Sequence, residues 1–448
     1  MNNSLGFTYK LGEPTVVPDL TKNPVYACFP DAHITVGPHP EQAGRYRMVW
    51  GSNQNYYTVG PTPYVEDHTV RENEQPFLDL RCDHPCWHCG GTWLMGVFPS
   101  QGCLVGFVHG EDHYKECCET GGCAWKSIGV TYSHDNGLTW SKPELIITSA
   151  VKRPEKPSWG GSGDFSVIKK DQQYFLFYCG GDIDSMSGVR IATSSDPLGR
   201  PGSWFKWWEE SFSQPGLGGR EGEVKELGVW GGNPSVTWNS YVQRWLLTWH
   251  SWEPFDVMLS SSTDLLHWAP AVRIVVEPDR KTWYPTIIGF GGDQECGQQA
   301  RLYYSSMNQS FGDRKFIGRD IVFFKPGEPE QYTPSPYSDP NYKPQQGYPA
   351  PPMDISQPVS YPQHAYGGGQ WQQPNQYGGY PQLQQCDLVG YPPPFNANTS
   401  QGGYPAQPPQ QHMYPPQQQP SKPTGPLAMM AGCLAAICCC GLLTDGLF

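Results

Sequence analysis

The sequence predicts an all-β protein: a five-bladed β-propeller, followed by a disordered stalk and a short C-terminal hydrophobic helix. Short apolar runs separated by turn residues recur over residues 20–327, with almost no helical periodicity. The composition then changes, since 23 of the 46 prolines lie between positions 326 and 423. An uncharged run of 18 residues begins at position 426. The expected domains are therefore residues 1–327, 328–425 and 426–448.

The first of these domains repeats a unit made of a strand, a turn, a second strand and a third strand. The clearest copies cover residues 164–196 and 233–264, and the same pattern fits residues 31–50, 92–133 and 284–305. Five such units favour a radial array of antiparallel sheets, which is a β-propeller. A pair of β-sandwiches is the structural alternative.

One turn motif supports the propeller. Residues 133–140 read Ser-His-Asp-Asn-Gly-Leu-Thr-Trp and match the Asp-box pattern Ser-x-Asp-x-Gly-x-Thr-Trp at every fixed position. We expect the Asp to accept backbone N–H groups, the Gly to take a left-handed conformation and the Trp to pack the hairpin onto its blade. Residues 262–268 and 195–204 hold degenerate versions. With this motif and the five units, residues 25–325 resemble the five-bladed propeller glycosidases of the furanosidase and xylosidase type.

Composition excludes several classes of function. The net charge is −12 and no basic stripe is present, which argues against nucleic acid as a partner. Aromatic residues make up 13% of the chain, including 17 tryptophans, so the chain is not wholly disordered. No glycine-rich phosphate loop opens a helix, and the N-terminus has no readable signal peptide.

The chemistry is expected at one mouth of the propeller channel. In each blade the first strand begins, and the antiparallel second strand ends, on the same face. First strands begin near Asp31, Asp164, Asn233 and Tyr284, and second strands end near residues 109–113, 182 and 250–253. At least four carboxylates therefore converge, and glycoside hydrolysis needs two.

The resemblance assigns roles to some of these residues. It implies that Asp31 is the base or nucleophile and that Asp164 orients the acid. The acid of the resembling families is a Glu, but Asn233 aligns there and cannot act as a proton donor. We therefore expect Glu111 to donate the proton, with Glu221 as the alternative. If neither does, the mouth binds sugar without cleaving it.

Aromatic and polar residues beside these carboxylates are the expected contacts of an oligo- or polysaccharide. Flat apolar rings suit the faces of sugar rings, although plain packing of the blades explains them equally well. The predicted substrate-binding residues are His109, Asp182, Trp159, Trp230, Asn233, His250, Trp252 and Trp283.

The second unit carries a cysteine-rich insertion. Cys82, Cys86 and Cys89 have the spacing of zinc ligands, and thiolates suit a tetrahedral structural site. Since no signal peptide is readable, we expect reduced thiols or a metal here rather than disulfides. No cofactor is expected apart from this zinc ion.

The remainder of the chain predicts a tether. Residues 328–425 repeat Gly-Tyr-Pro steps between Gln runs and suit an extended spacer, whose Tyr-Pro steps could also bind proteins. Together with the end of the chain, they resemble the cysteine-rich tail modules of eukaryotic membrane-associated proteins. We expect a C-terminal membrane anchor, with a tail buried against the body as the alternative. The candidate palmitoylation sites are Cys433, Cys438, Cys439 and Cys440.

The sequence thus predicts a membrane-tethered glycoside hydrolase that uses Asp31, Glu111 and Asp164. The alternative is a propeller that binds carbohydrate or protein without catalysis, displayed on the same stalk. Asn233 favours the alternative, and the carboxylates of Asp31 and Asp164 favour the enzyme. The side of the membrane that the body faces stays open.

Overall fold

The computed structural model describes residues 4–17, 30–51, 55–68, 86–114, 123–181, 188–308 and 314–338. The predicted helix at 426–448, its four cysteines and nearly all of the predicted stalk lie outside these residues. Within the described ranges, no helix is long and apolar enough to cross a membrane.

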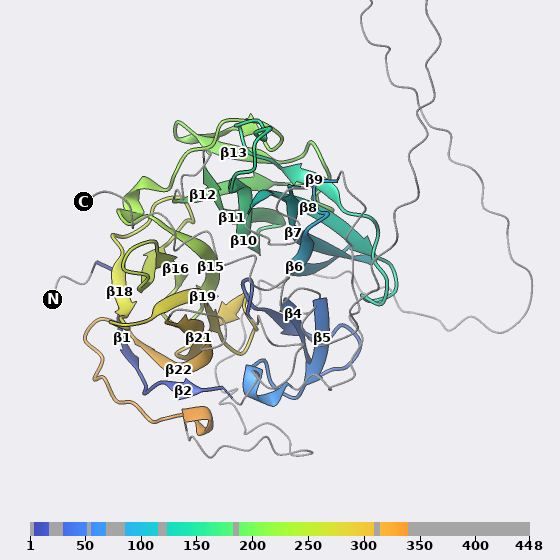
Figure 1. Cartoon of the computed structure of the whole chain (residues 1–448). Coiled ribbons are helices and arrows are strands. Elements are labelled where there is room, and N and C mark those ends of the chain that lie inside the picture. Colours follow the sequence, from blue (N-terminus) through green and yellow to red (C-terminus); the bar gives the residue numbers. More distant parts are fainter. Residues whose placement is uncertain are drawn as a thin grey trace, which may run out of the picture. The chain divides into compact units, whose positions relative to one another are not determined.

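The described strands form four sheets around a common centre (Figure 1). The nine-stranded sheet divides into two blades at a short parallel pair of β10 and β8, which gives five blades in all. The first blade contains β3 (Thr35–Pro38), β4 (Tyr46–Gly51) and β5 (Asn55–Gly60). The second contains β6 (Gly91–Ser100), β7 (Cys103–His113), β8 (Ala124–Ser133) and β9 (Glu144–Ile147). The third contains β10 (Gly160–Lys170), β11 (Gln173–Gly181), β12 (Val189–Ser194), β13 (Phe205–Trp208) and β14 (Ser211–Pro215).

The fourth blade contains β15 (Gly231–Asn239), β16 (Arg244–Ser251), β17 (Val257–Ser262) and β18 (Val272–Val275). The fifth contains β19 (Lys281–Ile288), β21 (Gln299–Met307), β22 (Lys315–Phe324), β1 (Thr8–Leu11) and β2 (Thr15–Val16). The short β20 (Glu295–Cys296) pairs in parallel with β15. The predicted all-β propeller body is confirmed by this topology.

Packing between neighbouring blades holds the ring together. Large buried apolar clusters span neighbouring blades: one contains Phe107 of the second and Phe165 of the third, and another contains Leu246 of the fourth and Leu302 of the fifth. Backbone N–H groups also bond to side chains of the next blade, as from Val236 to Ser166 Oγ at 3.0 Å. The apolar clusters form because each blade is covered by a neighbour on both sides, so both faces of its sheet carry apolar residues.

The N-terminal segment completes the fifth blade. β1 pairs antiparallel with β22, with Thr8 opposite Phe324 and Leu11 opposite Ile321. The predicted repeats begin after residue 20 and therefore do not include this strand. Its four residues, Thr-Tyr-Lys-Leu, are too few and too polar to show a strand period on their own.

The chain after the last strand also packs against the fifth blade. Tyr332 Oη and Ser335 Oγ donate to the Asp320 carboxylate at 2.9 and 2.6 Å, and Tyr337 Oη donates to Asp67 Oδ2 at 2.8 Å. Asp320 is itself paired with the buried Arg301 at 2.6 Å. The contacts of the body therefore continue to Ser338, past the predicted boundary at residue 327. We call residues 331–338 the clasp.

The turn at residues 133–140 has the geometry expected of its motif. The Asp135 carboxylate accepts the backbone N–H and the hydroxyl of Thr139, and Gly137 has φ +89°. Trp140 Nε1 donates to the Gly137 carbonyl at 3.2 Å. Asp264 holds the corresponding turn in the fourth blade. These turns lie at the ends of third strands and have a structural role.

Candidate active site

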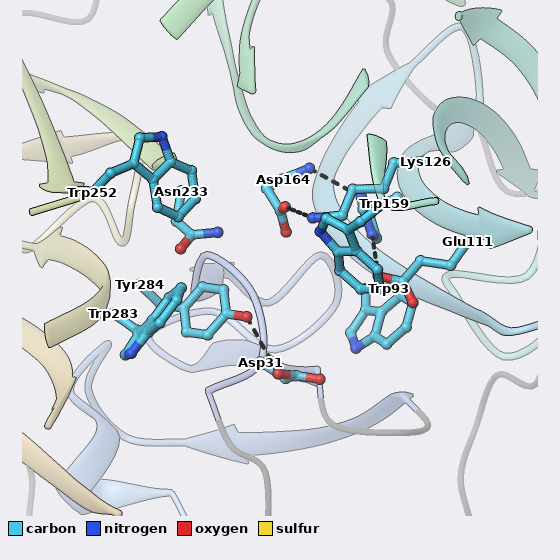
Figure 2. Close-up of a pocket in the computed structure, with 11 residues that line it drawn as sticks. Asp31, Trp93, Glu111, Lys126, Trp159, Asp164, Asn233, Trp252, Trp283 and Tyr284 are labelled. Atoms are coloured by element: carbon cyan, nitrogen blue, oxygen red, sulfur yellow. Dashed lines mark hydrogen bonds and ion pairs between the residues drawn. The ribbon is translucent and has the colours of Figure 1, made fainter. Parts of the chain in front are cut away.

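One cavity gathers side chains from all five blades (Figure 2). Eight of the residues predicted for the site line it: Asp31, His109, Glu111, Trp159, Asp164, Asn233, Trp252 and Trp283. Three further residues line it as well: Trp93, Lys126 and Tyr284. Carboxylates, one ammonium group and aromatic rings therefore face one small space.

Three of these side chains come from left-handed residues at β-bulges. Asp164, Asn233 and Tyr284 have φ values of +44°, +52° and +53°. Each interrupts the ladder of its first strand, where the register shifts in β10, β15 and β19. A left-handed residue at a bulge costs about 1–3 kcal/mol and commonly occurs beside functional sites, because it turns a side chain out of the strand pattern. In Figure 2 these three side chains point to the same space.

Asp31 lies in the segment before β3 and is 8% exposed. Tyr284 Oη donates to its Oδ1 at 3.3 Å. Burial raises the pKa of Asp31 to about 6, and the nearby Glu111 and Asp164 carboxylates also raise it, although Arg314 works against this shift. Asp31 therefore keeps a proton at a pH where an exposed carboxyl has lost it.

Glu111, near the end of β7, is held between two histidines. His109 Nε2 lies 3.3 Å from Glu111 Oε1, and His113 Nε2 lies 2.9 Å from Oε2. Burial acts to raise the pKa of Glu111, but the hydrogen bonds from both histidines outweigh it, and the pKa falls well below its usual value. Glu111 is thus held as a carboxylate, which does not suit the role of proton donor expected from the sequence.

Asp164 is paired with Lys126, whose Nζ donates to Asp164 Oδ2. Burial acts to raise the pKa of Asp164, but Lys126 and His109 outweigh it and hold the pKa below its usual value. Lys126 Nζ also lies 4.9 Å from the centroid of the Trp159 ring. His109 Nδ1 accepts the backbone N–H of Asp164 at 3.0 Å, so one histidine touches both carboxylate residues.

Asn233 faces the cavity from the fourth blade. Its backbone N–H donates to Cys179 Sγ at 3.1 Å, and its Oδ1 has no hydrogen-bond partner among the described residues. An amide cannot exchange a proton with a leaving group at neutral pH. The fourth blade therefore contributes a neutral polar group where the resemblance expects an acid.

Several predicted residues lie elsewhere. His250 is fully buried behind the cavity wall, in contact with the rings of Trp252, Phe255 and Trp283, and burial lowers its pKa to about 3. Glu221, the alternative acid, is absent from the cavity lining and is bound by Lys206 at 3.1 Å.

Trp230 is 69% exposed and is also absent from the cavity lining. Asp182 lies outside the described residues.

The zinc prediction needs correction at one ligand. Cys86 is disulfide-bonded, as is Cys123, and a disulfide sulfur is not the thiolate that zinc requires. Cys89 Sγ lies 3.7 Å from Asp112 Oδ1, and Cys82 lies outside the described residues. Within the part of the chain that the structure describes, no group of three His, Cys, Asp or Glu side chains is arranged to hold a metal ion.

The three lining residues that the sequence analysis missed have different causes. Lys126 is a charged residue near the start of a middle strand, and its partner Asp164 lies 38 residues away in the next blade. Trp93 is inside the apolar pattern of β6, where an aromatic residue indicates core. Tyr284 was placed at the start of a first strand, and this position, shared with Asp164 and Asn233, was the signal that could have found it.

Comparisons with known proteins give separate results for the two ends of the chain. No protein-family model matches the chain. The C-terminal region is 42% identical over 87 residues to the lipid-anchored plasma membrane protein uvi15 of Schizosaccharomyces pombe, covering 19% of this chain and 82% of uvi15. The C-terminal region belongs to the uvi15 family.

The body is similar to solved structures of low sequence identity. With Zg3597, a family 117 glycoside hydrolase from the marine bacterium Zobellia galactanivorans, the TM-score is 0.43 at 12% identity, covering 72% of this chain and 92% of that one. With the α-L-arabinofuranosidase PaAbf62A of Podospora anserina, the TM-score is 0.39 at 11% identity, and the match covers 71% of this chain and 97% of that one. With an N-acetylgalactosamine deacetylase of F. plautii, it is 0.41 at 12% identity, covering 71% and 96%. Because these scores are low, the chemistry of this chain has to be argued from its own cavity.

Proposed function

We propose that the body is a glycoside hydrolase in which Asp31 donates the proton and Glu111 acts as the base. One observation carries this assignment. Asp31 and Glu111 share a cavity, and their surroundings move their pKa values in opposite directions. Two carboxyl groups separated in this way can serve as the acid and the base of one reaction. This division reverses the roles expected from the sequence, where Asp31 was the base or nucleophile and Glu111 the proton donor.

The reaction needs both groups. Asp31 gives its proton to the glycosidic oxygen as the bond between this oxygen and the anomeric carbon breaks. A water molecule adds its oxygen to the anomeric carbon and gives a proton to Glu111, and the two carboxyl groups then return to their starting states by exchange with solvent. Lys126 and Asp164 balance each other's charge, so the cavity does not favour a charged sugar.

Aromatic rings give the cavity its second property. Trp93, Trp159, Trp252, Trp283 and Tyr284 all line it. Sugars have apolar ring faces and polar edges, and a cavity with flat rings and a few fixed polar groups matches both. The proposed substrate class is therefore a neutral oligo- or polysaccharide.

The test uses the full-length chain with a panel of neutral oligosaccharides and polysaccharides, and mass spectrometry to follow released sugars. We expect release by the wild type, and loss of release in both Asp31→Asn and Glu111→Gln. Glu226→Gln removes an exposed carboxylate absent from the cavity lining and should leave the rate unchanged. Release that survives in both cavity variants would show that hydrolysis uses other residues.

A second function is favoured by Asn233. With a neutral amide from the fourth blade and Asp164 paired to Lys126, the cavity also suits a sugar-binding protein without hydrolysis. Binding of a sugar on the same panel, with no release on any substrate, would establish this function.

We also propose that the C-terminal region tethers the body to a membrane by acylation of Cys433, Cys438, Cys439 and Cys440. The similarity to uvi15, a lipid-anchored plasma membrane protein, supports this proposal. Lipid attachment at two or more sites gives stable anchoring, whereas a single chain gives only weak binding. Replacement of all four cysteines by serine should move the protein from the membrane fraction to the supernatant. Acylation would be refuted if the wild type carries no thioester-linked acyl chain while it stays in the membrane fraction.

A further inference from the structure

Trp230 is an exposed aromatic residue next to the cavity. Its side chain is 69% exposed, the largest value among the exposed large apolar side chains of the described residues. It directly precedes β15, whose third residue is Asn233 of the cavity. Its carbonyl accepts the backbone N–H of Trp252, another cavity residue, at 3.2 Å. Trp230 is therefore fixed to the cavity wall by two backbone connections.

The position of Trp230 repeats in the neighbouring blade. Trp159 directly precedes β10, as Trp230 directly precedes β15. Trp159 is partly buried, lines the cavity and lies under Lys126. For Trp230, the structure shows no aromatic or cationic contact within its described residues. Equivalent places in two blades thus present one ring inside the cavity and one ring outside it.

Packing of the body does not explain an exposed ring at this place. Trp230 belongs to none of the buried apolar clusters in the described ranges, whereas the preceding Val229 packs against one of them. At about 3.3 Å per strand residue, the Cα of Trp230 lies roughly 10 Å along the chain from that of Asn233. A short oligosaccharide spans this distance, so one ligand can touch both.

We propose that the ligand is a linear chain of neutral sugars that runs from the cavity across the edge of the fourth blade and stacks on Trp230. This inference rests on the proposed function and adds to it a contact for the sugar chain outside the cavity. The negative net charge of the protein, −12, disfavours an acidic polymer at this surface. An exposed indole beside a cavity can gain a contact from the apolar face of a sugar ring without loss of packing elsewhere.

The experiment compares ligands of increasing length on the full-length chain. The probes are linear xylo-, gluco-, galacto- and arabino-oligosaccharides, from disaccharide to hexasaccharide, with affinities measured by isothermal titration calorimetry. Trp230→Ala should weaken hexasaccharide binding about two- to tenfold and leave disaccharide binding unchanged. Trp252→Ala removes a cavity ring and should weaken both. Val276→Ala, at a 55% exposed residue just after β18 of the same blade, is the control and should change neither.

The outcomes separate this inference from the proposed function. If the wild type binds these sugars but Trp230→Ala leaves the ratio of hexasaccharide to disaccharide affinity unchanged, the extended site is refuted and the cavity assignment stands. If the wild type binds none of them, both proposals fail. Trp230 is exposed, so its replacement should not unfold the protein, and an unchanged unfolding transition checks this point.

Discussion

The pair of Lys126 and Asp164 makes a strong prediction about stability. Lys126 belongs to β8 of the second blade and Asp164 to β10 of the third, and their side chains are only 16% and 13% exposed. Lys126→Met keeps most of the side-chain volume and leaves the Asp164 carboxylate buried without its cation. Removing one partner of a buried pair typically costs 3–5 kcal/mol. Because both groups keep some contact with solvent, we expect a loss of about 3 kcal/mol near neutral pH.

The pH dependence gives the sign of this effect. In the wild type the pKa of Asp164 is lowered, so its contribution to stability is present above its unfolded pKa and is lost as the pH falls through the folded pKa. Without Lys126, burial dominates and raises the pKa, so the buried charge destabilises the variant near neutral pH. That penalty disappears when Asp164 is protonated. The difference in the free energy of unfolding between wild type and variant should therefore narrow on acidification and be small below about pH 4.

Urea unfolding followed by tryptophan fluorescence measures both quantities. Lys142→Met, at an exposed lysine just after the second-blade turn, is the control and should change stability by less than about 0.5 kcal/mol. The double variant Lys126→Met with Asp164→Asn should recover a large part of the loss, because the unpaired charge is gone. A loss under about 1 kcal/mol, or a difference that widens on acidification, would refute the reasoning.

Three further predictions concern other parts of the body. Because the folded pKa of Asp31 is raised, the wild type loses stability as the pH rises from about 4 to about 6. In urea unfolding, Asp31→Asn should therefore increase stability at neutral pH by up to about 3 kcal/mol, with no gain below about pH 4. The rate of sugar release by the wild type should also fall above about pH 6. Gly137→Ala should cost more than about 1 kcal/mol in thermal unfolding, since its φ of +89° is strained for any residue with a Cβ. Gly37→Ala, which has no such φ and meets nothing within 4 Å, should cost less. Ser335→Asp places a second carboxylate against Asp320 and should release the clasp by charge repulsion. Faster proteolysis at residues 331–338 would reveal this release. Ser335→Ala removes only the hydrogen bond and should have a smaller effect.

The fold could be predicted from the repeats in the sequence, whereas the contacts between blades could not be predicted. The alternation in segments such as 173–181 and 244–251 depends only on neighbours within one strand, so it can be read from sequence. The third strand β5 and the closing strand β1 were missed. β1 lies at the opposite end of the sequence from the blade that it completes, and its short polar sequence carries no signal of that partner.

In the candidate site, too, the positions of residues on strands could be predicted, whereas their contacts and roles could not. Strand order placed Asp31, Asp164 and Asn233 at the starts of first strands, and the structure brings them to one cavity. The roles of the carboxyl groups depend on burial and on side-chain rotamers. Glu111 is an acidic residue between two histidines in the sequence, but only its contacts at 3.3 and 2.9 Å show that it is held ionised. Lys126 could not be paired with Asp164 without the packing of two blades.

The clasp and the closing strand have a mechanical consequence. A force applied to the chain beyond Ser338 acts first on the hydrogen bond from Tyr337 to Asp67, and then on those from Ser335 and Tyr332 to Asp320. These bonds have to break before the load reaches β22, which lies between β21 and β1. The bonds of the clasp join side chains, whereas β22 is held to its neighbours by backbone pairing along the strand. Under the tether proposed above, tension from the C-terminal region would therefore open the clasp before it reaches the pairing of the fifth blade.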